Sequence, residues 1–409
     1  MTRRRVAVTG IGVISALGNE PATMFARLMS GESGVRAFTL NGPQFSYEGV
    51  GAFADFDPRT RPAGNSAEQL DRVTQFAAAV AADAIADSGI EFTDALRQRT
   101  GVMFGTGMGS SNSLEQFFMQ LLLRDPDRVR PLTVLQVMNN ASAGRIAQHY
   151  GFSGPDVTYS CACSSSSISI GEAFRQIQHG YADVMLAGGA EASLVYGFFK
   201  AWQAMRVLAP ADRTDPTATC RPFSKNRSGL VLGEGGAMVV LEEFDAAQKR
   251  GARIYGELIG YGSSNDYGHI TKPSVEGQAR AMSLALDDAK ISPGAVDYIN
   301  AHGTATVLND ATETNAIKKV FGAHASEVAV SSTKSMHGHL LGGAGALEFV
   351  IALLALTNGA VPPTAHLDVS DPECDLDYVP GKGRDQDVGC IMSNSFAFGG
   401  SNAVLVARR

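Results

Sequence analysis

The chain has 409 residues, enough for a large core and for two domains or two related halves. Hydrophobic residues make up 44% of the sequence and charged residues 18%, a balance typical of a well-buried α/β enzyme. The net charge of −7 argues against a nucleic-acid partner, because phosphate contacts need a basic surface. No apolar run approaches the roughly 20 residues that cross a bilayer, so we expect no membrane span.

The N-terminal residues place three arginines before an apolar stretch, as a secretory signal would. Glycines interrupt that stretch and no small-residue cleavage site follows, so a buried strand over Val6–Gly10 is the better interpretation. Gly10 and Gly12 do not complete a dinucleotide-binding loop, since Ser15 occupies the place of the third glycine.

The five cysteines are odd in number and scattered through a long chain, which argues against a disulfide framework. No cysteine or histidine cluster has the sequence spacing of a metal site, so we expect no metal. A reducing, cytoplasmic setting fits this pattern best.

Short Val/Ile-rich strands alternate with Ala-rich helices, which predicts a layered α/β architecture. After the first strand, a helical apolar period over Leu70–Ser88 ends near Gly89. Further strands are predicted at residues 99–104, 156–160, 183–186, 254–259, 296–299, 327–331 and 389–393, and an apolar helix at residues 343–356.

The order of these elements suggests that the chain is a duplication. In each half a strand runs into reactive side chains, an apolar helix follows, and the next strand ends near paired glycines. Any α/β protein repeats strand, helix and strand, so the order alone does not prove it. The charged stretch Glu242–Arg253 is the best joint, and we predict an N-terminal half over residues 1–252 and a C-terminal half over 253–409.

Residues 160–169 read SCACSSSSIS, with two cysteines one residue apart. A strand precedes this stretch and an apolar helix follows it, so Cys163 falls at a strand-to-helix junction. Free N–H groups and the positive helix end at such a junction favour a thiolate and can bind an oxyanion, and the serines can cap the helix. Cys161 lies further back towards the strand. The alternative is that both are packed structural cysteines.

Two histidine motifs favour the reactive interpretation. NAHGTAT, containing His302, follows one predicted strand, and STKSMHGH, containing His339, follows another. Both imidazoles are thus expected at strand ends, where sites on α/β sheets gather. One cysteine with two such histidines indicates acyl transfer through a thiolate. Four other histidines are expected to be structural or peripheral: His179, His269, His324 and His366.

The motifs CACSSS, NAHGTAT, STKSMHGHLLGGAG and NSFAFGGSN stand in the order and spacing of a β-ketoacyl-acyl-carrier-protein synthase. The chain most resembles the synthase II type of bacterial fatty-acid elongation, over nearly its whole length. The resemblance implies the thiolase fold, an α/β fold with duplicated βαβαβαββ halves in a five-layered α-β-α-β-α arrangement, normally as a homodimer.

By motif position, the resemblance makes Cys163 the nucleophile rather than Cys161, and His302 and His339 the catalytic histidines. Phe398 corresponds to a gating phenylalanine whose backbone N–H joins that of Cys163 in an oxyanion hole. The same resemblance makes Lys334 the lysine of the motif and Glu348 its expected ionic partner, which is also counted among the substrate-binding residues. Thr304 and Thr306 are expected to contact the pantetheine arm, Met108 to line the acyl pocket, and Arg206 to contact the carrier protein.

The implied activity condenses an acyl thioester, held on Cys163, with malonyl-acyl-carrier protein, releasing carbon dioxide and giving 3-oxoacyl-acyl-carrier protein. It would serve fatty-acid, polyene or polyketide elongation and needs no metal or redox cofactor. Neutral His302 and His339 would stabilise the enolate, and the Lys334 cation would help to keep them unprotonated. The implied partner is an acyl carrier protein bearing its acyl and malonyl groups on phosphopantetheine.

The sequence leaves three alternatives to a homodimeric synthase. The chain could be the active ketosynthase subunit of a heterodimer with a chain-length-factor partner. It could also be a non-catalytic chain-length-factor-like subunit, although such subunits usually lack the nucleophile. A thiolase acting on coenzyme A fits less well, because NSFAFGG occupies the region of the second thiolase cysteine.

The chain departs from the family pattern around the site. Asn65, Glu68 and Gln69 stand where synthase II members usually carry basic residues for the acidic carrier protein, and Arg124, Arg128 and Arg130 offer another basic patch. Nearer the motifs, the departures are Ala397 before the gating phenylalanine, Val307-Leu308-Asn309 after HGTAT, and His337 where a small residue is common. These differences favour a specialised synthase.

Overall fold

The computed structural model describes residues 3–42, 44, 46–60 and 69–409, so the predicted departures at Asn65 and Glu68 lie outside the described residues. Mostly buried segments with many β-branched residues form the core strands, and Asp156–Tyr159 at one end of the sheet is the most exposed of them. In the first half these are β1 (Val6–Ile14), β4 (Thr100–Gly105), β5 (Asp156–Tyr159), β6 (Val184–Glu191) and β7 (Gly235–Glu243). In the second half they are β8 (Gly256–Asn265), β9 (Tyr298–Asn300), β10 (Ala329–Ser331), β13 (Cys390–Phe396) and β14 (Ser401–Arg408).

The ten strands form one sheet in the order β10-β9-β13-β14-β8-β1-β7-β6-β4-β5. Its two halves have the same design. The second strand from the outer end pairs in parallel with the strand on each side of it, and the remaining pairings within the half are antiparallel. The halves join where Val6–Val8 of β1 pair with residues 256–258 of β8. This repeated order confirms the duplication that the sequence suggested, while the boundary at residue 252 stays a prediction.

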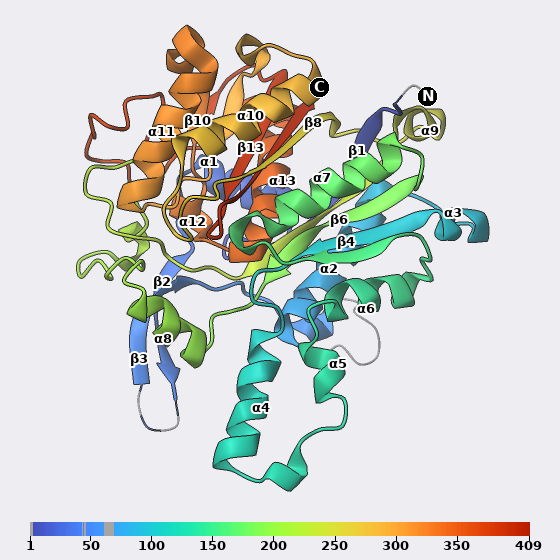
Figure 1. Cartoon of the computed structure of the whole chain (residues 1–409), viewed down its shortest axis with the longest axis vertical. Helices are drawn as coiled ribbons and strands as arrows, with labels where there is room; N and C mark the ends of the chain where they lie inside the picture. Colours follow the sequence, from blue (N-terminus) through green and yellow to red (C-terminus); the bar gives the residue numbers. More distant parts are fainter. Residues whose placement is uncertain (1–2, 43, 45, 61–68) are drawn as a thin grey trace.

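Two helices lie between the half-sheets (Figure 1). Both α7 (Ser165–Gln178) and α13 (Ala344–Asn358) contact strands of each half as well as one another. They approach closely at Gly345, where a Cβ atom would lie only 2.1 Å from Ser167 Oγ, so only glycine fits there.

The helix α13 is apolar on all sides because sheet strands cover both of its faces. The stretch Leu341–Asn358 has a mean hydropathy of 1.6 over 18 residues, so one apolar run does approach the length of a membrane span, contrary to the sequence expectation. It is 89% buried inside the fold, as a core helix of this length would be.

Four helices cover the outer faces: α2 (Arg72–Ser88) and α6 (Ala141–Tyr150) on the first half, and α10 (Val275–Ala289) and α11 (Val307–Phe321) on the second. The Asp71 carboxylate caps the start of α2 and Gly89 ends it in the left-handed conformation, where the sequence placed its end. Each half therefore reads βαβαβαββ, and the five layers α-β-α-β-α are confirmed.

Smaller elements are attached to this core. A β-hairpin of β2 (Val35–Asn41) and β3 (Ser46–Ala52) and a helical excursion of α4 (Ser111–Leu123) and α5 (Thr133–Val137) project from it in Figure 1. The remaining helices and strands are α1 (Pro21–Met29), α3 (Asp94–Gln98), α8 (Tyr196–Ala204), α9 (Phe244–Lys249), α12 (Lys334–His337), β11 (Ala360–Val361) and β12 (Arg384–Asp385).

Candidate active site

Cys163 lies in a single 3₁₀ turn, Ala162–Ser164, between the end of β5 and the start of α7, at the predicted strand-to-helix junction. The serines satisfy the backbone of this turn: Ser165 Oγ accepts from the Cys161 N–H at 2.8 Å, and Ser164 Oγ donates to the Cys161 carbonyl at 2.9 Å. Cys163 is only 6% exposed, and the backbone N–H of Phe398 donates to its sulfur.

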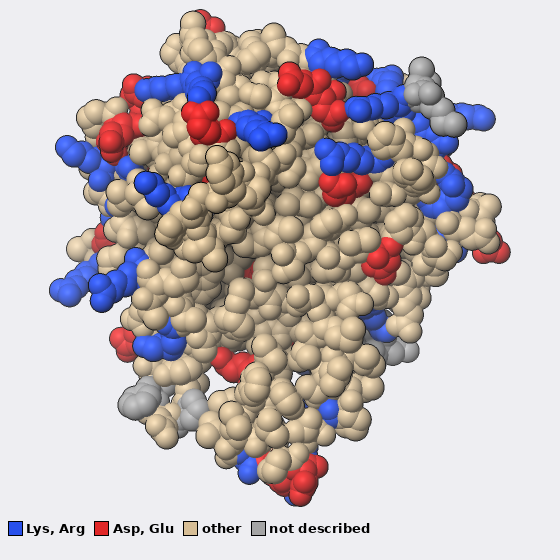
Figure 2. All heavy atoms as spheres, viewed as in Figure 1, with Lys and Arg blue, Asp and Glu red and all other residues tan. Residues whose placement is uncertain are grey.

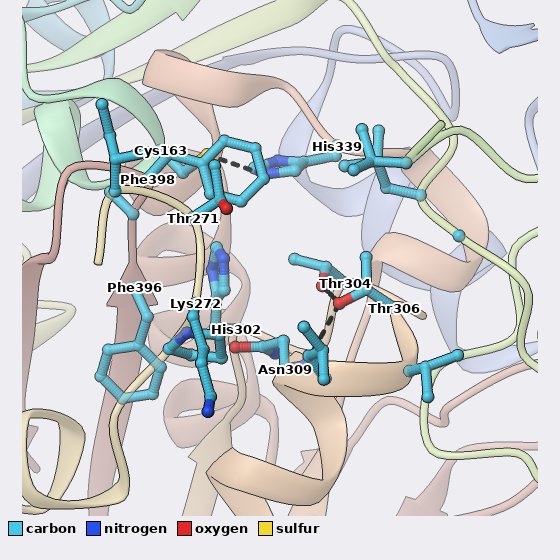
Figure 3. Close-up of a pocket in the computed structure, with 18 of the residues that line it drawn as sticks. Cys163, Thr271, Lys272, His302, Thr304, Thr306, Asn309, His339, Phe396 and Phe398 are labelled. Carbon is cyan, nitrogen blue, oxygen red and sulfur yellow. Dashed lines mark hydrogen bonds between the residues drawn. The ribbon is translucent and has the colours of Figure 1, made fainter. Parts of the chain in front are cut away.

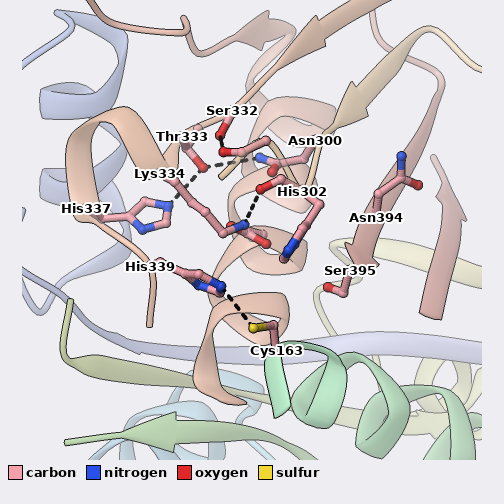
Figure 4. Close-up of polar contacts among 12 residues, drawn as sticks. Cys163, Asn300, His302, Ser332, Thr333, Lys334, His337, His339, Asn394 and Ser395 are labelled. Carbon is pink, nitrogen blue, oxygen red and sulfur yellow. Dashed lines mark hydrogen bonds and ion pairs between the residues drawn. The ribbon is translucent and has the colours of Figure 1, made fainter. Parts of the chain in front are cut away.

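Both motif histidines face this thiol (Figure 4). The Nε2 atom of His339 lies 3.1 Å from Cys163 Sγ, and the rings of His302 and His339 are 5.4 Å apart between centroids, nearly perpendicular. His302 follows β9, where Glu313 Oε1 accepts from its backbone N–H at 2.8 Å. Strands and loops from both halves of the chain thus bring one thiol and two imidazoles together.

The hydrogen bonds of His339 determine its tautomer. Its Nδ1 atom accepts the Leu341 N–H at 3.2 Å, so in the neutral ring the proton is on Nε2 and points at Cys163. Burial lowers the pKa of both His302 and His339 well below the ordinary histidine value, and the nearby Lys334 charge lowers both further. Both rings are therefore neutral hydrogen-bond donors near pH 7.

Lys334 lies behind the histidines with no solvent exposure. It donates to the His302 carbonyl at 2.6 Å and to Glu348 Oε1, the ionic partner that the motif predicted (Figure 4). Glu348 is fully buried in α13 and does not line the cavity described below, and its expected place among the substrate contacts stays a prediction. Its visible contact is with Lys334.

The resting thiol differs from the sequence expectation. Burial raises the pKa of Cys163 to about 12, although the Lys334 charge and the Phe398 N–H act in the opposite direction. The helix start was expected to favour a thiolate, but desolvation dominates at a site this deeply buried. Cys163 is therefore a neutral thiol near pH 7.

A cavity of about 270 Å³ leads from the surface to Cys163 (Figure 3). Its walls include both histidines, the paired hydroxyls of Thr304 and Thr306 (2.9 Å apart), exposed Arg206, and Phe398, whose ring stacks near Trp202 with centroids 6.1 Å apart. The three departures Val307, Leu308 and Asn309 also line it.

Sequence reasoning missed part of this wall. Thr271 and Lys272 come from the loop after β8, which contacts the turn that contains Phe398: the Ile270 carbonyl accepts from the Gly399 N–H at 2.7 Å. His269, expected to be peripheral, lines the cavity and its Nδ1 accepts the N–H groups of Thr271 and Lys272. No motif of the sequence marked this loop, because its contacts with the gate arise only when β8 and β14 pair.

Met108 and the arginine patch lie away from the cavity wall. Met108 belongs to the apolar cluster that contains Cys163, on the turn after β4, but it does not line the described cavity. Arg124, Arg128 and Arg130 line a separate polar hollow beside α4 and α5.

The Cys163 sulfur and the histidine nitrogens lie within 4.8 Å of one another, close enough in principle to share a metal ion. A histidine ligand needs a free lone pair towards the metal, usually with its other nitrogen donating to an acceptor. His339 has the reverse arrangement, since its Nδ1 accepts from Leu341 and its proton faces Cys163. This donor set fits hydrogen-bond donation to a substrate better than metal ligation.

Comparison with known families accounts for this arrangement. Residues 3–247 match the model for the N-terminal domain of β-ketoacyl synthases, and residues 255–368 match the model for the C-terminal domain. The chain belongs to the β-ketoacyl synthase family. The resemblance drawn from the four motifs is thereby confirmed.

The relatives of this synthase-family chain extend over its full length. A 3-oxoacyl-[acyl-carrier-protein] synthase 2 of Coxiella burnetii is 42% identical, covering 100% of this chain and 99% of the relative. Among solved structures, the ishigamide ketosynthase/chain length factor is 35% identical with a TM-score of 0.91. A type II polyketide ketosynthase in complex with its acyl-carrier protein, bound to the hexaketide, is 32% identical with a TM-score of 0.91. Both structures cover 99% of each chain, which confirms the thiolase-like fold.

Proposed function

We propose that this chain is a condensing acyltransferase that extends an acyl chain by two carbons, using malonyl-acyl-carrier protein, with Cys163 as the nucleophile. The observation that carries the proposal is the buried Cys163 thiol at the inner end of the cavity, in contact with the Nε2–H of His339 and the N–H of Phe398. Such a constellation of thiol, neutral donors and backbone N–H groups serves acyl transfer.

The first half-reaction loads the enzyme. Cys163 sulfur attacks the acyl thioester, the bond between the acyl carbon and the carrier sulfur breaks, and the thiol proton ends on the departing carrier thiol. The N–H groups of Cys163 and Phe398 stabilise the tetrahedral oxyanion. Because burial raises the pKa of the thiol, Cys163 still carries its proton when the thioester arrives.

The second half-reaction extends the chain. Malonyl thioester loses carbon dioxide, and the electron pair of the broken C–C bond passes to an enolate whose oxygen accepts hydrogen bonds from His302 and His339. The enolate carbon attacks the acyl carbonyl on Cys163, and the sulfur leaves and regains a proton. The histidines can serve this step in their neutral form, since each neutral ring keeps one N–H to donate.

The substrate arm and the carrier protein approach from the cavity mouth. Thr304 and Thr306 place two hydroxyls on the wall, where they suit the amides of a pantetheine arm. Among the described residues, one arginine and one lysine line the cavity, Arg206 and Lys272. The cavity mouth therefore offers positive charge to an acidic carrier protein. We propose that the acidic carrier protein and the reaction are cytoplasmic, because the five free cysteines of this chain stay reduced there.

A second chain of the same fold is the other proposed partner. Exposed apolar residues gather on α4, on α5 and around them: Phe118, Leu121, Leu122, Leu123, Leu132, Val134, Leu135 and Met138. Surfaces of this kind usually mark protein interfaces. In Figure 2 the face of this projection is nearly free of charged side chains above its tip. We propose that a second copy or a chain-length-factor-like subunit covers it.

The proposed reaction is tested by mixing the protein with an acyl-carrier protein and malonyl-carrier protein and following the products by mass spectrometry. We expect loss of carbon dioxide and a 3-oxoacyl-carrier product two carbons longer than the acyl donor. If no donor chain length gives acyl-enzyme or product, alone or with a chain-length-factor-like subunit, the proposal is wrong.

A further inference from the structure

His337 is a buried histidine that the proposed mechanism does not use. It lies at the end of α12, two residues before His339, and is 1% exposed. Figure 4 shows its ring turned away from Cys163 and towards Thr333. Both nitrogens of this buried imidazole make hydrogen bonds. The family resemblance leads one to expect a small side chain at this position, so the imidazole needs its own explanation.

The two hydrogen bonds of the His337 ring have fixed directions. Its Nδ1 atom lies 2.8 Å from the Gly338 carbonyl oxygen, which can only accept, so Nδ1 carries the proton. Its Nε2 atom, 2.9 Å from Thr333 Oγ1, then accepts the threonine hydroxyl. Burial lowers the pKa of His337 to about 3, which keeps the ring in this neutral form.

We propose that His337 is a positioning residue: it holds the Gly338–His339 peptide and links it to the strand that carries His302. The proposal rests on the proposed condensing function. The oxygen of this peptide accepts from His337, and its N–H donates to the Val231 carbonyl at 2.7 Å. The peptide plane is thus held from both sides, immediately before the ring that contacts Cys163.

The link to the other histidine runs through Thr333. Thr333 Oγ1 donates to His337 and accepts from Asn300 Nδ2 at 3.5 Å. Asn300 ends β9, two residues before His302. The chain Asn300–Thr333–His337–Gly338 therefore ties together the two segments that present the histidines to one substrate carbonyl.

Gly338 explains why this peptide needs support. Its φ of +69° lies in the left-handed region, and a Cβ atom there would lie 3.0 Å from Ala52 Cβ, so glycine is required. A glycine peptide is free to rotate unless its polar atoms are held. Without the His337 donor, the Gly338 carbonyl is left unpaired in the interior, and the peptide before His339 is held only through its N–H.

Three substitutions separate positioning from bulk packing. His337→Asn places an amide N–H where Nδ1 stands, His337→Gln reaches only the Nε2 position, and His337→Leu removes both contacts. The matched control is His324→Leu, since His324 also bonds a backbone carbonyl, that of Val296 at 3.1 Å, on the far segment after α11.

Malonyl-carrier decarboxylation and acylation of Cys163 are measured separately in each variant. We expect decarboxylation to fall by about tenfold to 10²-fold in the Leu and Gln variants, with acylation far less affected, and to recover largely in the Asn variant. The proposal is overturned if Asn is no better than Gln, if Leu and Gln keep the parental decarboxylation rate, or if both half-reactions fall together with the melting temperature.

A second readout does not need the reaction. In protein labelled with ¹⁵N-histidine, NMR should find the His337 proton on Nδ1 and none on Nε2, the signal being assigned by its loss in the Gln variant. The opposite tautomer overturns the positioning role. If the parent enzyme fails to decarboxylate malonyl-carrier protein, the proposed function fails, while this tautomer measurement still decides the arrangement of His337.

Discussion

At the scale of single residues, the electrostatics of the site depend on Lys334. It is fully buried, its ammonium group bonds Glu348 and the His302 carbonyl, and its charge lowers the pKa of both catalytic-site histidines. Removing one partner of a buried ion pair leaves the other charge uncompensated, whereas replacing both with apolar groups can be nearly neutral.

The Lys334→Ala variant should therefore lose about 3–5 kcal/mol of unfolding free energy, because Glu348 is left buried and unpaired. Urea unfolding of the purified protein measures this loss. The double variant Lys334→Met/Glu348→Leu should recover most of it. Equal losses in the single and double variants would mean that packing, and not charge, sets the stability here.

His302→Ala and His339→Ala should each slow malonyl decarboxylation by roughly 10²–10³-fold, the usual cost of removing one donor to a developing oxyanion. Acylation of Cys163 should be hurt less, because the backbone N–H groups of Cys163 and Phe398 serve that step. Rapid-quench measurements of the two half-reactions decide this. Equal losses in both would mean that the histidines mainly activate Cys163.

Sequence motifs located Cys163, His302 and His339 because each follows a core strand or the turn after it. These strands lie in opposite halves of the sheet, and the side chains meet because the two halves pack against α7 and α13. The sequence motifs could not predict the protonation states of these side chains. The raised pKa of Cys163 and the proton on Nε2 of His339 depend on burial and on a single N–H from Leu341. Neither depends on a residue type that a pattern can recognise.

At the scale of elements, hydrogen bonds to Glu191 fix the turn after β4. This carboxylate, fully buried at the end of β6, accepts the N–H groups of Gly107 (2.7 Å), Met108 (3.1 Å) and Gly342 (3.1 Å). Burial raises the pKa of Glu191 to about 7. The glycines on both sides of Met108 would by themselves leave its backbone free to move, but the hydrogen bonds to Glu191 on another strand fix it.

Met108→Phe nevertheless should shorten the longest acyl chain that the enzyme accepts while leaving short chains nearly unaffected. The Met108 side chain packs in the same apolar cluster as Cys163, so a larger ring there overpacks only the space that a long chain would fill. Acylation rates across a series of chain lengths measure this. A uniform loss over all lengths would assign Met108 to the core and place the acyl pocket elsewhere.

At the scale of the whole molecule, the repeated order of elements suggested the duplication, and the resemblance carried by the four motifs predicted the fold. The joining of the half-sheets through β1 and β8 was not predictable, because three paired residues leave no pattern of their own. The apolar face of α4 and α5 was also missed. Its leucines satisfy the same helical pattern as core residues, and only their exposure separates the two.

Leu122→Glu and Leu135→Glu should dissociate the assembly formed through this face. In the single chain the side chains of Leu122 and Leu135 are 71% and 61% exposed, and in the proposed complex they are covered, so each variant would bury a charge. Light scattering of the chain, alone and with a chain-length-factor-like subunit, measures the state. Leu284→Glu, on the outer helix α10, is the control. An unchanged assembly in both variants would move the interface to another surface.

The central claim is that Cys163 carries the acyl chain during condensation. Its most direct test is the intact mass of the parent, Cys163→Ala and Cys161→Ala proteins after incubation with an acyl-carrier thioester, before and after malonyl-carrier protein is added. We predict an acyl adduct on the parent and on Cys161→Ala that disappears on addition of malonyl-carrier protein, and no adduct on Cys163→Ala. An adduct that persists in Cys163→Ala would contradict the account.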